Sequence, residues 1–199
     1  SLAERGHTVE LFEASDAIGG QFAIAQRIPG KEEFAETIRY YSGELERRGV
    51  RVHLGTYATA DQLASGGFDE VVVATGVEPR IPDIPGVDHP SVMTYAELVL
   101  GEKVAGERVA VIGAGGIGVD VSEFLTTVDS PTLDLAAWQE EWGVGDPGET
   151  RGGLRTPAPE PSPREVFLIQ RKTSSIGRGL GRTTGWVHRA ALKAKGVQL

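Results

Sequence analysis

Two patterns of apolar positions alternate along this chain. Short runs of apolar, often β-branched residues predict strands at 8–13, 50–54, 68–76, 109–112 and 166–169. Between the runs, apolar residues recur at helical spacing: Phe34, Ile38, Tyr41 and Leu45 predict an amphipathic helix over residues 31–48. Strands that alternate with helices indicate an α/β fold with parallel sheets.

Proline divides this pattern into two parts. Pro79, Pro82, Pro85 and Pro90 interrupt residues 77–104, which predict an interdomain connection with a short helix near its end. We expect residues 1–104 to form one nucleotide-binding unit together with this connection, and residues 105–199 to form a second. Both units are expected to be incomplete, because the first begins without a glycine-rich opening strand and the second stops where its next strand should start.

The second unit also carries an insertion. About 30 residues should separate a glycine motif from the end of the next strand, yet a segment at about residues 129–164 precedes the strand at 166–169. Within it, Leu135, Trp138 and Trp142 share one face of an expected helix. That face either covers an edge of the domain or forms a docking surface for a further domain or an acyl-CoA.

A glycine motif follows the strand at 109–112. Gly113, Gly115 and Gly118 have the G-x-G-x-x-G spacing, and a helix with apolar residues at 121, 124 and 125 comes next. The first glycine permits a tight turn, the second lets a pyrophosphate approach the backbone, and the third lets the helix pack on the strand. This context predicts a dinucleotide site.

The strand at 166–169 is followed by Gln170, Arg171 and Lys172, where an NAD site would carry an acid. A guanidinium and an ammonium pair with a 2′-phosphate, which an acid would repel. The second unit is therefore expected to prefer NADP(H). The basic, glycine-rich loop over residues 174–186 either closes over the adenosine end of the cofactor or is an ordinary flexible loop.

Composition narrows the chemistry further. The chain has no cysteine, so thiolate nucleophiles and cysteine-ligated metal clusters are excluded within these residues, and its four histidines lack metal-ligand spacing. No apolar run approaches the length of a membrane span, and we expect a cytoplasmic protein. Residues 151–199 hold ten basic and two acidic side chains. Without a series of stacking aromatics, this basic part favours a small anionic ligand over nucleic acid.

The first unit shows a second candidate nucleotide site. Glu13 ends the strand at 8–13, where an acid accepts hydrogen bonds from an adenosine ribose. Gly19, Gly20 and Gln21 follow and allow close passage of a second dinucleotide.

Together, the Glu13-x5-Gly-Gly-Gln-Phe stretch, the Arg27-Ile-Pro-Gly-Lys-Glu-Glu-Phe34 stretch, Ala74-Thr-Gly76 and the Gly113 motif resemble the NADPH-dependent 2,4-dienoyl-CoA reductase family. This family is related to old yellow enzyme, and the likeness is to its C-terminal, glutathione-reductase-like FAD/NADP-binding part. The resemblance implies two incomplete Rossmann-like units joined by the Pro-rich linker, the first for FAD and the second for NADP(H). The cofactor contacts it implies are Glu13, Gly19, Gly20, Gln21, Lys31, Ala58, Thr75, Gly76, Gly113, Ala114, Gly115, Gly116, Ile117, Gly118, Arg171 and Lys172.

The resemblance also implies a reaction. In the whole enzyme, NADPH passes hydride to FAD, and electrons continue through an Fe–S cluster to FMN in a barrel domain, where a 2,4-dienoyl-CoA is reduced. FMN, the cluster, the acyl-CoA site and the proton-donating residues belong to that barrel. No catalytic residue or metal site is expected in these 199 residues, which alone should be inactive.

Two alternatives stay open at this stage. The first is an amine dehydrogenase of the same architecture, whose second unit holds only an ADP-type ligand, although Arg171 and Lys172 speak against it. The second is a non-catalytic nucleotide-binding module. Oligomeric state is not predicted by any of these patterns.

Overall fold

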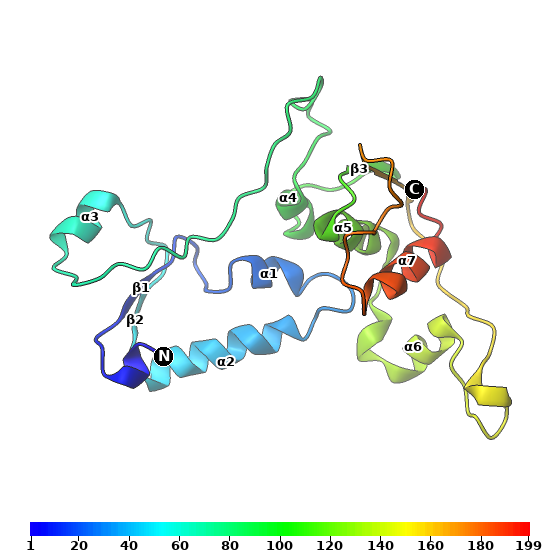
Figure 1. Ribbon diagram of the computed structural model, residues 1–199, viewed down its shortest axis with the longest axis horizontal. Helices are drawn as coiled ribbons and strands as arrows, with labels where there is room; N and C mark the ends of the chain where they lie inside the picture. Colours follow the sequence, from blue (N-terminus) through cyan, green and yellow to red (C-terminus); the bar gives the residue numbers. More distant parts are fainter. The chain divides into compact units, whose positions relative to one another are not determined.

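The computed structural model describes residues 1–199, which divide into two compact α/β units (Figure 1). The first unit comprises residues 1–26 and 33–78, and the second comprises residues 27–32 and 79–199. The predicted boundary at residue 104 placed the Pro-rich connection in the first unit. In the structure, residues 79–104 of this connection make their contacts within the second unit. No helix is both long and apolar enough to cross a membrane.

The first unit is built on a pair of short parallel strands. In β1 (Glu10–Phe12) and β2 (Arg51–His53), Leu11 lies opposite Val52. The connection between them contains α2 (Phe34–Arg47), so that two parallel strands joined through a helix form a βαβ arrangement. The remaining elements are η1 (Ala3–Arg5), α1 (Gln21–Ala25) and α3 (Ala60–Ser65).

The strand predicted at residues 68–76 does not form. This stretch is extended, but no neighbouring segment pairs with its backbone, and Val72 and Val73 are 74% and 80% exposed. The prediction was wrong because β-branched residues only favour packing on a sheet, whereas a strand also requires a neighbouring segment that hydrogen-bonds to its backbone. No residue of the first unit is buried.

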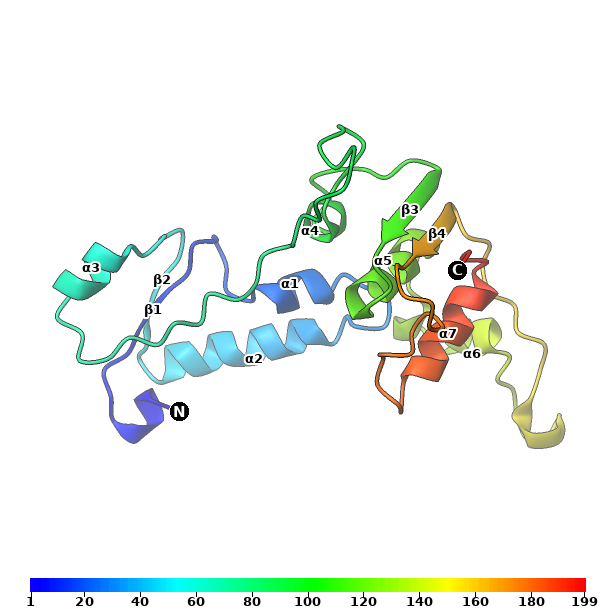
Figure 2. The ribbon, with the colours of Figure 1, turned by 45° about the horizontal axis from the view of Figure 1, so that its top comes forward.

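The second unit contains the larger core. Strands β3 (Arg108–Ile112) and β4 (Glu165–Ile169) pair in parallel along their whole length (Figure 2). Gln198 bridges to Phe167 on the other side of β4. Helices α5 (Gly116–Thr126) and α7 (Gly185–Ala194) pack together beside them. The core side chains are Leu98, Val119, Val121, Leu125, Val166, Leu168, Leu192 and Val197.

The insertion between α5 and β4 forms its own small helix. After η2 (Pro131–Leu133), α6 (Leu135–Trp142) begins where the Asp134 carboxylate accepts hydrogen bonds from the N–H groups of Ala136 and Ala137. Gly143 ends the helix in the left-handed conformation. The return to β4 passes through η3 (Arg151–Gly153).

Residues 27–32 belong to the second unit, although α1 and α2 on either side of them belong to the first. The Arg27 guanidinium donates to the carbonyl of Leu100 (2.9 Å), just after α4 (Tyr95–Val99). Ile28 is buried. The Thr132 hydroxyl donates to the Glu32 carboxylate (2.9 Å). This segment is therefore held by apolar burial and by polar contacts along its length.

Candidate functional site

The turn from β3 into α5 has the geometry that its glycines predict. Gly113 lies at φ 109°, a conformation that favours glycine. A Cβ atom added at Gly118 would lie 1.8 Å from the Gly113 carbonyl oxygen. Only a residue without a side chain lets the helix return this close to the turn, so Gly118 fixes how α5 departs from the strand.

The start of α5 is open to a ligand. Its N-cap is Gly115, which offers no side-chain cap, and Gly115, Gly116 and Ile117 are exposed. The first N–H groups of an α-helix have no acceptor within the helix, and they carry the positive end of its dipole. These donors fit a pyrophosphate, and nothing at Gly115 or Gly116 would obstruct its approach, since even an added Cβ there would meet no atom within 4 Å.

The basic residues after β4 start from the same edge of the sheet. The Gly113 N–H donates to the Ile169 carbonyl (2.8 Å), which joins the ends of β3 and β4. Arg171 and Lys172 follow two and three residues later and are exposed. The structure thus brings the glycine turn and the basic pair, 58 residues apart in sequence from Gly113 to Arg171, to adjacent strand ends. Ligands of parallel α/β sheets bind at this edge.

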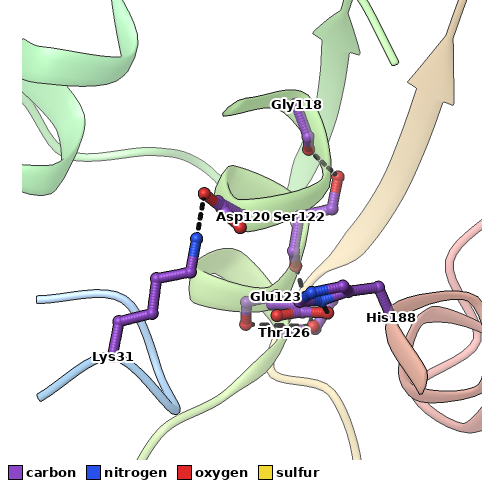
Figure 3. Close-up of polar contacts among 7 residues, drawn as sticks. All are labelled: Lys31, Gly118, Asp120, Ser122, Glu123, Thr126 and His188. Atoms are coloured by element: carbon purple, nitrogen blue, oxygen red, sulfur yellow. Dashed lines mark hydrogen bonds and ion pairs between the residues drawn. The ribbon is translucent and has the colours of Figure 1, made fainter. Parts of the chain in front are cut away.

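Two buried side chains of α5 are polar, and both are hydrogen-bonded (Figure 3). The buried Ser122 hydroxyl donates to the Gly118 carbonyl (2.7 Å), and the buried Thr126 hydroxyl donates to the Ser122 carbonyl (2.8 Å). Because both hydroxyls donate to carbonyls of their own helix, their burial costs little and neither is left to bind a ligand.

Lys31, a predicted cofactor contact, lies in the second unit and forms an ion pair with Asp120 on α5. Its ammonium is 2.5 Å from the carboxylate, and both side chains are about three-quarters buried or more. Figure 3 shows the lysine reaching from the 27–32 segment to the helix. This contact joins that segment to the helix that carries the glycine motif. A cofactor contact by Lys31 stays a prediction.

One turn further along α5, Glu123 meets His188 of α7 (Figure 3). The His188 Nδ1 atom is 2.8 Å from the Glu123 carboxylate. Burial raises the pKa of the Glu123 carboxyl, while the hydrogen bond and charge of His188 act in the opposite direction. The pair fastens α7 to the glycine-motif helix.

The predicted FAD contacts lie in the first unit, apart from Lys31. Glu13 follows β1, and its carboxylate accepts a hydrogen bond from the Ser15 N–H (2.9 Å). Gly19 and Gly20 both have positive φ, and Gln21, which begins α1, donates from its side chain to the Val77 carbonyl (3.2 Å). This bond joins the residue that follows the glycine pair to the residue that follows Thr75 and Gly76, both of which are exposed. Ala58 lies apart, before α3.

Sequence reasoning missed the partners Asp120, Glu123 and His188. Asp120 and Glu123 are the only charged residues of α5, and charges on a helix that contributes to the core are a weak signal that both need partners. The partners themselves lie 89 and 65 positions away, and no local pattern identifies them. No group of three or more His, Asp or Glu side chains gathers to hold a metal ion.

Comparison with known proteins places this site in context. Residues 1–199 match the family described as pyridine nucleotide-disulphide oxidoreductase. The chain is 30% identical over 198 residues to a metal reductase of Desulforamulus reducens, covering 96% of this chain and 28% of that protein. It is 45% identical over 83 residues to an N,N-dimethylglycine/sarcosine dehydrogenase of Chromohalobacter salexigens, covering 42% of this chain and 12% of that protein.

A solved structure agrees with these sequence matches. A 2-naphthoyl-CoA reductase in complex with 2-naphthoyl-CoA superposes with a TM-score of 0.75 at 25% identity, covering 98% of this chain and 24% of that one. The chain therefore spans about a quarter of the length of the reductases that it matches along nearly its whole sequence.

Proposed function

The chain belongs to the pyridine nucleotide-disulphide oxidoreductase family, and we propose that its parent enzyme moves hydride from NADPH to FAD and onward to a 2,4-dienoyl-CoA. Its fold is that of an FAD/NAD(P)-binding oxidoreductase domain. The proposal adds two points to this family assignment, namely the choice of NADPH over NADH and an acyl-CoA as the substrate.

The observation that carries the proposal is the joining of the glycine turn to the basic strand end. The 2.8 Å hydrogen bond from Gly113 to Ile169 sets the open N-terminus of α5 beside the strand that leads to Arg171 and Lys172. A dinucleotide whose pyrophosphate lies on the helix presents its adenosine 2′ position toward the end of the neighbouring strand. Two cations there favour the 2′-phosphate.

The cofactors supply the hydride chemistry when bound, and the residues of this chain place them. Gly113 to Gly118 hold the pyrophosphate of NADP(H). Glu13, the Gly19–Gly20 pair and the Thr75–Gly76 turn offer part of an FAD site in the first unit. In this proposal FMN, an Fe–S cluster and the acyl-CoA site belong to the remainder of the parent enzyme. The similar reductase solved with 2-naphthoyl-CoA supports the choice of an acyl-CoA substrate.

The test is substrate-dependent oxidation of NADPH by the full-length enzyme under anaerobic conditions, followed by its absorbance. Addition of a 2,4-dienoyl-CoA should start NADPH consumption, and the matched saturated acyl-CoA should not. If a dienoyl-CoA leaves the NADPH signal unchanged while an aromatic acyl-CoA such as 2-naphthoyl-CoA starts it, the cofactor assignment stands and the substrate assignment fails.

A second candidate is an amine dehydrogenase, favoured by the 45% identity to the N,N-dimethylglycine/sarcosine dehydrogenase. In that case the second unit would hold an ADP-type ligand, and Arg171 and Lys172 would have no 2′-phosphate to bind. A second anaerobic assay, which follows flavin absorbance, separates the two candidates, because reduction of the flavin by dimethylglycine, with no response to NADPH, is the outcome expected for the amine dehydrogenase. No turnover in either assay would favour a non-catalytic nucleotide-binding module.

A further inference from the structure

Two carboxylates lie on the helix that carries the glycine motif. Asp120 and Glu123 are one turn apart on α5, and the other residues of that helix are uncharged. Because an α-helix rises by a fixed step at each residue, Glu123 lies about 10 Å from Gly116 along the helix axis. A carboxylate at this distance repels an anion bound at the start of the helix unless a cation balances its charge.

The two carboxylates are balanced by different kinds of cation. The Lys31 ammonium lies 2.5 Å from the Asp120 carboxylate, and the His188 Nδ1 atom lies 2.8 Å from the Glu123 carboxylate. A lysine side chain keeps its charge throughout the neutral pH range, whereas histidine is the side chain that ordinarily gains or loses a proton there. The charge of Asp120 is therefore balanced throughout that range, and the charge of Glu123 is balanced only while the pair holds a proton.

The surroundings of the Glu123–His188 pair make it hold that proton firmly. Burial raises the pKa of the Glu123 carboxyl, His188 lowers it through its hydrogen bond and its charge, and the charges of Asp120 and Lys31 raise and lower it respectively. A buried carboxyl that is bonded to a histidine shares one proton with it, and the pair holds this proton more tightly than either group would alone.

The pair is enclosed by the fold but not sealed from water. The side chain of Glu123 is 14% exposed and that of His188 is 28% exposed. Helices α5 and α7, which carry the two residues, pack against each other. The shared proton can therefore exchange with solvent, while the two helices keep the pair together.

From these contacts we propose that Glu123 and His188 are positioning residues of the dinucleotide site, and that the proton they share links the affinity of this site to pH. With the proton bound, these two side chains together with Lys31 and Asp120 carry no net charge. Without it they carry one net negative charge, which opposes an anion at the start of the same helix. The inference rests on the proposed dinucleotide site at Gly113 to Gly118, and it does not depend on the choice of NADPH or on the acyl substrate.

The experiment is calorimetric titration of the full-length protein with NAD⁺ from about pH 5.5 to pH 8.5. Each titration is made in two buffers with different heats of ionisation, which yields both the affinity and the number of protons taken up. NAD⁺ is the probe because the 2′-phosphate of NADP⁺ itself titrates in this range.

Three variants are compared with the wild type, namely Glu123→Gln, His188→Gln and the double variant. Glutamine removes the titrating group and still provides a side chain that can form a hydrogen bond. His89→Gln is the control, because it removes an exposed histidine of the same unit.

We expect the wild-type affinity for NAD⁺ to fall about fivefold as the pH rises through the range, with a proton taken up on binding where the affinity falls. Either single variant holds its proton less tightly, so the fall should move to lower pH by about one unit or more. The double variant should keep the high affinity across the range and take up no proton. His89→Gln should match the wild type. A purely structural role would instead lower the affinity equally at every pH.

The proposal is overturned if the wild type takes up no proton on binding NAD⁺, if it does not bind NAD⁺ at any pH, or if the double variant keeps the wild-type pH dependence. The wild-type measurement needs no variant, and either single variant replaces a double variant that fails to fold. Failure of the proposed function is judged separately, by turnover of NADPH with an acyl-CoA, and either test can fail while the other succeeds.

Discussion

Single residues determine the geometry of the glycine turn, and Gly118 has the least freedom among them. An added Cβ would overlap the Gly113 carbonyl oxygen at 1.8 Å and approach Leu168 of the neighbouring strand at 3.4 Å. The obstacle is backbone, which cannot rotate away as a flexible side chain can.

We therefore expect Gly118→Ala to destabilise the protein by about 3 kcal/mol or more and to weaken NADP⁺ binding at least tenfold, because α5 must shift away from the turn. Chemical denaturation and calorimetric titration would measure the two effects. Gly106→Ala is the control, since a Cβ there meets no atom within 4 Å. Equal stability of the two variants would contradict the close packing at Gly118.

The basic pair after β4 is predicted to set cofactor preference. Changing Arg171 and Lys172 together to Ala should cost about tenfold or more per lost phosphate contact in kcat/KM for NADPH. NADH use should stay nearly unchanged, because the pyrophosphate contacts at Gly113 to Gly118 are common to both cofactors. Steady-state kinetics of the full-length enzyme give the ratio. A variant that kept its preference for NADPH would move the selectivity to other residues.

At this scale, the sequence sufficed where the signal was local. Gly113, Gly115 and Gly118 lie within six residues, and the basic pair follows its strand directly, so spacing alone located the turn and the strand end beside it. That a nucleotide binds there stays a prediction. The ion pair between Lys31 and Asp120 was not predictable, because its partners are 89 positions apart and meet only after folding. The same holds for His188, whose helical position indicates nothing about Glu123.

Among the elements, α4 shows how a five-residue helix is stabilised by its ends. The Thr94 N–H donates to the Glu97 carboxylate (2.7 Å), and the Glu97 N–H donates to the Thr94 hydroxyl (3.2 Å), which completes a capping box. The Lys103 ammonium lies 2.8 Å from the same carboxylate. The hydrogen bonds from Lys103 and from the Thr94 backbone lower the pKa of Glu97 to about 2.

A pKa lowered by folding stabilises the folded state above the ordinary pKa of 4.5, and this contribution is lost as the pH falls from that value toward 2. Glu97→Gln should therefore reduce the acid sensitivity of unfolding between about pH 5 and pH 2, as measured by urea midpoints across this range. Glu102→Gln, which makes the same charge change at an exposed acid without an ion pair, should leave that sensitivity as it is. Equal slopes for wild type and Glu97→Gln would contradict the argument.

Helices were easier to predict than strands for a physical reason. The hydrogen bonds of α2 and α5 join residues four positions apart, so periodicity and glycine positions located them to within a few residues. The strand predicted at 68–76 does not form, because its backbone hydrogen bonds would have to come from a segment distant in sequence. Val71 to Val73 match a strand in residue type alone.

For the whole molecule, this extended stretch has a consequence for association. It presents unpaired backbone together with exposed valines, in a unit where no residue is buried. Such an edge is a template for pairing with another chain. We expect the 199-residue chain by itself to associate in solution.

Val73→Lys should reduce this association, because a charge at the centre of the stretch opposes strand pairing. Sedimentation velocity over a range of concentrations would measure it. Val104→Lys changes a valine of similar exposure (83%) outside the stretch and should leave association unchanged. A wild-type chain that sediments as a monomer, with a cooperative unfolding transition, would show that the first unit is self-sufficient.

The placement of residues 27–32 has a genetic consequence. Since the chain enters the second unit at residue 27, leaves it after residue 32 and re-enters it at residue 79, the codons for that unit are interrupted by those for the first. A gene fragment that began at codon 79 would omit Ile28, Lys31 and Glu32, and with them a buried side chain and the partners of Asp120 and Thr132. Recombination that exchanges the second unit between relatives should therefore preserve function only when both stretches are inherited together.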